Sequence, residues 1–148
     1  MKPKLFNENP KTLGEHLKKR RCEMGLMQKA VAKKLRVNQF TLINWEKDRT
    51  GPEVRYLPRI IAFLGYDPFP HGQSLGGRIT ARRRTMGLSI KRLAKVLGFD
   101  EGTLAHYETG LWNPNGKRLV RIERFLTETT KQYVRCGRLP SAKHESRR

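Results

Sequence analysis

The sequence predicts an all-α protein built from two small domains of the same kind. Apolar residues recur at helical spacing, and no stretch of useful length alternates apolar and polar residues as a half-buried strand does. The chain also repeats itself. Its 148 residues have room for one ordinary domain or two very small ones, and the repeat favours two.

The repeat appears when the chain is shifted by 62 positions. Residues 13–64 then align with residues 75–126 without a gap, and 20 of the 52 aligned positions are identical. Chance gives about three identities over such a length. We therefore expect an N-terminal arm (1–11), a first domain (12–65), a linker (66–73), a second domain (74–127) and a disordered basic tail (128–148).

Each copy begins with a predicted helix that has start and stop signals. Thr12 and Glu15 have the spacing of a capping box, and Ser74 takes the Thr12 position in the second copy. Gly25 and Gly87 end this helix. Its apolar face consists of Leu13, Leu17 and Met24 in the first copy and of Leu75, Ile79 and Met86 in the second.

The next two helices of each copy are joined by a tight turn. Asn38 and Asp100 are suitable N-caps for the helix after the turn, and Pro52 and Pro114 stand where a last helix begins. Two short helices joined in this way form a helix-turn-helix, whose second helix presents polar residues to a major groove. Each copy is thus expected to hold four or five short helices.

Composition points to a polyanionic partner. The chain has 32 Lys and Arg against 13 Asp and Glu, which gives a formal charge of +19. Nucleic acid is the first candidate for such a chain, and an anionic membrane is the second. The longest apolar run, residues 60–64, is too short to span a bilayer, and the first 11 residues contain no apolar run typical of a signal peptide. We expect a cytoplasmic, nucleoid-associated protein without a membrane partner.

Metal, disulfide and enzyme chemistry are not expected. Cys22 and Cys136 lie 114 positions apart, without Cys or His partners at the spacing of metal ligands. The sequence contains no paired-carboxylate, nucleophile–base or phosphate-loop motif. We therefore predict no metal site, no cofactor and no enzymatic activity.

A longer string of positions occurs in both copies. In the first copy it is Leu13, Gly14, Leu17, Arg21, Gly25, Leu26, Gln28, Val31, Ala32, Leu35, Leu42, Trp45 and Glu46. In the second it is Leu75, Gly76, Ile79, Arg83, Gly87, Leu88, Ser89, Leu93, Ala94, Leu97, Gly98, Leu104, Tyr107, Glu108 and Gly110. These strings resemble the Xre/Cro-type helix-turn-helix family, which includes the lambdoid phage repressors.

The resemblance implies domains that bind duplex DNA with their third helix. The base-reading positions carried over from the family are Gln39, Phe40 and Asn44 in the first copy and Glu101, Gly102 and His106 in the second. It also implies a phosphate contact from Gln28, which its counterpart Ile90 cannot reproduce. The pairs Arg21–Glu46 and Arg83–Glu108 correspond to structural ion pairs of the family, and a role in DNA binding stays open for them.

The two sets of base-reading residues differ in chemistry. Gln39 can form a bidentate pair with adenine, and Asn44 can do the same or hold a phosphate. Phe40 suits a thymine methyl group, although packing against its own domain stays open. Glu101 can accept from the amino group of cytosine but also feels the negative field of the duplex, and Gly102 has no side chain to read a base. We expect the first domain to supply most of the base readout.

Further residues beside the third helices are predicted to contact phosphates, the alternative being a solvated basic face. They are Lys47, Arg49, Arg55, Tyr56, Lys117 and Arg118. The sequence thus predicts a transcriptional regulator whose partner is double-stranded DNA, bound by one chain as a pseudo-dimer. A homodimer, an antitoxin-like or other protein-interaction module with a protein partner, and a sequence-tolerant architectural DNA binder stay open.

Overall fold

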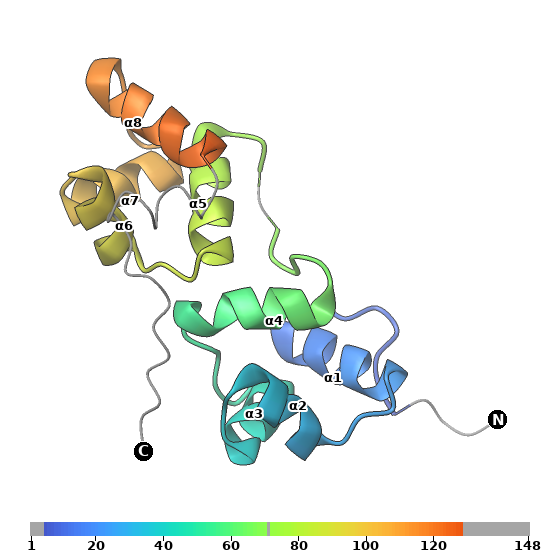
Figure 1. The fold of residues 1–148 in the computed structure, drawn as a ribbon. Helices are drawn as coiled ribbons and strands as arrows, with labels where there is room; N and C mark the ends of the chain where they lie inside the picture. The colour runs from blue at the N-terminus through green and yellow to red at the C-terminus, as the bar shows by residue number, and fades with distance from the viewer. Residues whose placement is uncertain (1–4, 71, 129–148) are drawn as a thin grey trace, which may run out of the picture. The chain divides into compact units, whose positions relative to one another are not determined.

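The computed structural model of the chain describes residues 5–70 and 72–128. Within these residues the fold consists of eight α-helices and one 3-10 helix, without strands (Figure 1). The predicted all-α class is confirmed. Contacts between Cα atoms divide the chain into two compact units between residues 70 and 71. This division falls inside the segment expected to be the linker.

The first domain, blue to green in Figure 1, packs its helices around one apolar core. Its elements are α1 (Leu13–Glu23), α2 (Gln28–Leu35), α3 (Gln39–Glu46), the 3-10 helix η1 (Val54–Tyr56) and α4 (Leu57–Leu64). The core includes Leu17, Val31, Leu35, Leu42, Trp45 and Ile60. Because α1 and α2 both pack against α3, this central helix is fixed from two sides.

The second domain, yellow-green to orange in Figure 1, repeats this arrangement with four α-helices. They are α5 (Leu75–Thr85), α6 (Ile90–Leu97), α7 (Glu101–Thr109) and α8 (Gly116–Thr127). Its core includes Ile79, Leu93, Leu97, Leu104, Ile122 and Phe125. Both α5 and α6 pack against α7, as α1 and α2 do against α3.

Local signals explain where the helices begin and end. The Thr12 hydroxyl accepts from the Glu15 backbone N–H at 3.2 Å, and the Glu15 carboxylate accepts from the Thr12 N–H, so the capping box is complete. After α1 the chain turns through Gly25, and after α5 through Gly87, with φ values of +64° and +69°. Such positive φ values favour glycine, which lacks a Cβ.

Two expectations about the helices were wrong in detail. Met24 was placed on the apolar face of the first helix, but it is the C-cap of α1 and is 44% exposed, whereas Met86 packs against the second core. The last helix of each domain begins later than the prolines Pro52 and Pro114. In the first domain the chain first forms η1 and then α4, and in the second α8 begins at Gly116.

The glycines Gly14 and Gly76 let the first helix of each domain approach the end of the third. A Cβ on Gly14 would collide with the backbone carbonyl oxygen of Trp45. A Cβ on Gly76 would lie 2.6 Å from the carbonyl oxygen of Tyr107, with Glu108 also in contact. Because backbone atoms cannot rotate away, only glycine permits this close packing.

The start of the linker is held by the first domain. The Tyr66 hydroxyl lies 2.6 Å from Nδ1 of His16, and Phe69 packs against the core. Burial is the main cause that lowers the pKa of His16 and raises that of Tyr66. Residues 1–4 of the expected arm and residues 129–148 of the expected tail lie outside the described residues.

Candidate nucleic-acid interface

The helices α3 and α7, called here the reading helices, each follow the tight turn of a helix-turn-helix. In the first domain Arg36 makes the turn in the left-handed region, with a φ of +56°, and Asn38 caps α3 by accepting from the Phe40 N–H at 2.8 Å. In the second domain Gly98 makes the turn, and Asp100 caps α7 by accepting from the Thr103 N–H at 3.2 Å. Both reading helices therefore begin at a defined residue.

The start of α3 presents its predicted base-reading residues outward. Gln39 is exposed, and Phe40 is 75% exposed, so its ring is not packed against its own domain. Asn44, one turn later, is half-buried. An amide and an apolar ring at the first two positions of a helix are suited to the edges of bases in a major groove.

A hollow of about 620 Å³ lies beside this face of α3. Its lining combines four cations and two amides with one carboxylate and one methionine: Lys18, Arg21, Lys29, Lys47, Gln28, Gln39, Glu46 and Met27. Gln28, predicted to contact phosphate, donates from Nε2 to Oε2 of Glu46 at 3.0 Å. This bond holds the Gln28 amide, at the start of α2, against Glu46 at the end of α3.

Each reading helix is tied to the first helix of its domain by a bidentate ion pair. Arg21 Nε and Nη2 donate to the Glu46 carboxylate at 2.6 and 2.9 Å, and this hydrogen bonding raises the pKa of Arg21 despite its partial burial. Arg83 donates to Glu108 in the same way at 2.7 and 3.1 Å. Each arginine also donates from Nη1 to a carbonyl of the turn after the first helix, at Leu26 or Leu88. The two pairs thus position the reading helices.

The arginines just before these pairs are also engaged within their domains. Arg20 donates to the backbone carbonyl of Phe63 at 3.3 Å, and Arg82 donates to the backbone carbonyl of Glu128. The sequence identified both only as basic residues. No local pattern distinguishes a cation that binds a distant carbonyl from one that faces solvent.

The predicted phosphate contacts of the first domain fall into two groups. Lys47 and Arg49 are exposed at and after the end of α3. Arg55 forms an ion pair with Glu53 at 3.1 Å and lies over the ring of Tyr56. Tyr56 itself packs against Trp45, with ring centroids 5.5 Å apart. Arg55 and Tyr56, the second group, therefore already have partners within the domain.

The start of α7 offers different chemistry. Glu101 and Gly102 are exposed, so this helix begins with a carboxylate and a residue without a side chain. His106 is half-buried, and its ring lies 4.3 Å from that of Trp112, measured between centroids. Trp112 was not among the residues predicted to belong to this face. The sequence pattern that could have identified it is the pair of consecutive apolar residues, Leu111 and Trp112, directly after Gly110.

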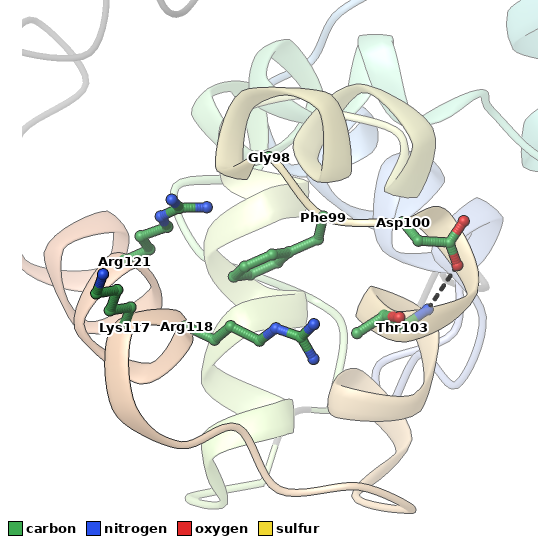
Figure 2. A pocket seen from close by; sticks show the side chains of 7 residues that line it. All are labelled: Gly98, Phe99, Asp100, Thr103, Lys117, Arg118 and Arg121. Carbon is green, nitrogen blue, oxygen red and sulfur yellow. Dashed lines mark hydrogen bonds between the residues drawn. The ribbon is translucent and has the colours of Figure 1, made fainter.

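A cationic hollow of about 320 Å³ lies between the turn before α7 and the start of α8 (Figure 2). The predicted phosphate contacts Lys117 and Arg118 line it together with Arg121, which was not predicted to contact phosphate. Figure 2 shows Arg118 extending from α8 past Phe99 towards Thr103. Arg118 donates to the Tyr107 hydroxyl at 3.3 Å, and Arg121 donates to the Leu97 carbonyl at 3.3 Å.

Other kinds of site find no support in the described part of the chain. Within residues 5–70 and 72–128, no helix is long and apolar enough to cross a membrane. The same residues contain no group of three His, Cys, Asp or Glu side chains arranged to hold a metal ion.

Comparison with known families identifies both domains. A helix-turn-helix family model matches residues 17–69 and again residues 79–132, which together exceed half of the chain. No curated protein and no solved structure matches the chain. The two matches reproduce the repeat and the two helix-turn-helix units described above, and the family is one of DNA-binding regulators and not of enzymes. The chain belongs to the Xre/Cro-type helix-turn-helix family and carries two tandem copies of its domain.

Proposed function

We propose that the protein is a sequence-specific transcriptional regulator that binds duplex DNA through both domains. The observation that carries this proposal is the start of α3, where Gln39 and Phe40 are exposed side by side. Lys47 and Arg49, both exposed at the other end of α3, supply charge for the flanking phosphates. Gln39 would pair with adenine, Phe40 would contact a thymine methyl group, and Asn44 would bind a base or a phosphate.

The second domain is proposed to contribute mainly affinity, together with a different or weaker base preference. Glu101 accepts from a cytosine amino group only against the repulsion of the phosphates, and Gly102 reads no base. Lys117, Arg118 and Arg121 gather beside the start of α7, where they can neutralise a phosphate. The first domain therefore supplies most of the specificity.

Two unlike reading helices in one chain suit an asymmetric site. A symmetric dimer of single domains favours a palindrome, whereas one chain with two different domains can cover two dissimilar half-sites without dimerising. We propose residues 12–65 and 74–127 as the two binding domains and double-stranded DNA in the cytoplasm as the partner.

Selection from a random duplex library at about 150 mM salt tests this proposal, because such salt weakens sequence-independent phosphate binding. We expect a motif of two dissimilar blocks roughly 10 base pairs apart. A single short block would assign recognition to one domain. Retention of DNA without any motif would instead indicate an architectural binder, and no retention would direct attention to protein partners.

Two variants test the division of roles between the domains. We expect Gln39→Ala to weaken binding to the selected site by about 1–3 kcal/mol and to relax the preference at one base pair. Glu101→Ala should leave the preference largely unchanged. Gln73→Ala, which removes an exposed glutamine outside both reading helices, is the control. Equal loss of preference in the Gln39 and Glu101 variants would contradict the proposed division.

A further inference from the structure

The loop between α7 and α8 carries the most exposed apolar pair of the second domain. Leu111 is 67% exposed and Trp112 is 51% exposed, whereas Trp45, the other tryptophan of the chain, is 4% exposed. In the repeat, Leu111 and Trp112 take the positions of Arg49 and Thr50. At the place where the first domain presents a charged side chain, the second presents apolar ones.

Two contacts with the reading helix hold Trp112 in place. Its backbone N–H donates to the His106 carbonyl at 3.3 Å, and its indole lies against the His106 imidazole, with ring planes inclined at 51°. His106 occupies one of the three base-reading positions of α7. The indole is therefore continuous with the face that α7 would turn to DNA.

The net charge of the domain indicates what kind of partner this apolar loop contacts. Residues 74–127 contain 11 Lys and Arg against four Asp and Glu, so a second copy of the domain is repelled and a polyanion is attracted. A strand of duplex DNA alternates phosphates with apolar deoxyribose rings. Tryptophan fits such a strand because it combines a broad apolar surface with one N–H donor at its edge.

We propose that Leu111 and Trp112 form an uncharged contact with the sugar–phosphate backbone of duplex DNA. The two side chains cover deoxyribose, and the indole Nε1–H donates to a phosphate oxygen. This inference rests on the proposed docking of α7 on DNA. Because the contact adds no cation, it releases no counterion, in contrast to the contact expected from Arg49.

Fluorescence of the unmodified protein tests the contact directly. Trp45 is buried, so quenching by the neutral molecule acrylamide reports mainly on Trp112. The probe is a mixed-sequence duplex of about 30 base pairs at low salt, which suffices because a backbone contact needs no particular sequence. We expect the duplex to protect the tryptophan emission from acrylamide. Binding of the duplex, seen by anisotropy, without any protection would overturn the inference and leave DNA binding intact.

The salt dependence of two variants tests the uncharged nature of the contact. Trp112→Ser should weaken duplex binding roughly fivefold without changing the slope of log K against log salt concentration. Arg49→Gln should weaken binding and reduce that slope by about one. Val120→Ser removes another exposed apolar side chain of the same domain, one that is 55% exposed on α8, and should leave both quantities unchanged.

The remaining outcomes separate this inference from the proposed function. Unchanged affinity in a folded Trp112→Ser variant, or a slope reduced as much as by Arg49→Gln, would overturn the uncharged contact alone. Failure of the unmodified protein to bind the duplex even at low salt would overturn both proposals. The quenching experiment needs no substitution, so it decides the question even if a variant fails to fold.

Discussion

The two domains differ at the start of their reading helices and agree in what holds those helices in place. Gln39 in the first domain corresponds to Glu101 in the second, and Phe40 corresponds to Gly102. Behind these positions both domains use the same bidentate Arg–Glu pair and the same close approach at a glycine. The exposed positions have diverged between the copies, while the Arg–Glu pairs and the close approach at the glycine are shared.

This difference follows from the cost of change at the two kinds of position. Removing one partner of a buried ion pair leaves an uncompensated charge, whereas exchanging an exposed side chain usually has little effect on stability. A duplicated domain can therefore acquire a new binding face while its scaffold stays fixed. Four experiments test whether the scaffold and the exposed face differ in this way.

The largest effect is expected from the ion pairs. Glu46→Ala and Glu108→Ala should each cost about 3–5 kcal/mol, because an arginine loses its carboxylate partner. Glu46→Ala should cost about 1 kcal/mol more, since Gln28 also donates to Glu46 and Ile90 takes its place in the second domain. Hydrogen exchange followed separately in the helices of each domain measures both losses. Equal losses would mean that the Gln28 bond contributes nothing.

The next largest effect concerns the close approach of the first and third helices. Gly14→Ala and Gly76→Ala should each destabilise their domain by about 3 kcal/mol, because the added methyl group meets backbone atoms that cannot move aside. Gly51→Ala is the control, since a Cβ there meets no atom within 4 Å. Thermal unfolding should separate the two variants from the control. A control that unfolds as early as they do would contradict the steric explanation.

A smaller effect is expected at the start of the second helix. Ser89 caps α6 by accepting from the Arg92 N–H at 3.2 Å, whereas Met27 at the corresponding position of α2 has no capping side chain and is 74% exposed. Met27→Ser should stabilise the first domain by about 1 kcal/mol, and Ser89→Ala should destabilise the second by a similar amount. Chemical denaturation of the two variants measures both shifts. Unchanged stability after Met27→Ser would show that the exposed methionine compensates for the missing cap.

The smallest effect depends on pH. Hydrogen bonding, chiefly from the Lys11 backbone N–H, lowers the pKa of Glu15 below the ordinary value of 4.5. The ionised Glu15 carboxylate therefore stabilises the fold at neutral pH. This stabilisation is lost as the pH falls through the pKa that Glu15 has in the folded state. Gly77 stands at this position in the second domain. Unfolding measured from pH 7 down to pH 3 should show that Glu15→Gln removes part of the acid sensitivity of α1. The acid sensitivity of α5 should be the same in both proteins.

The sequence predicted features that depend on local spacing and missed those that depend on distant contacts. The capping box at Thr12 and the glycines that follow the first helices are local, and they lie as expected. The contact between Trp112 and His106 depends on where a loop returns to its helix, which no periodicity describes.

The base-reading residues of the candidate site were identified only through the family resemblance, because composition and helical spacing do not indicate which exposed residues meet DNA. Gln28 illustrates the limit of that approach. Its position suggested a phosphate contact, and the structure adds a hydrogen bond to Glu46 that a linear motif cannot reveal.

The packing of Phe69 against the first domain has a consequence for avidity. Only residues 70–73 separate this anchored residue from Ser74, the N-cap of α5. Those five steps along the chain extend over at most about 18 Å. Under the proposed function, binding of one domain to DNA would keep the other at a high effective concentration nearby, but so short a tether would not reach half-sites that are moved far apart. Phe69, which anchors one end of this tether, thus limits how far apart the two proposed half-sites can lie.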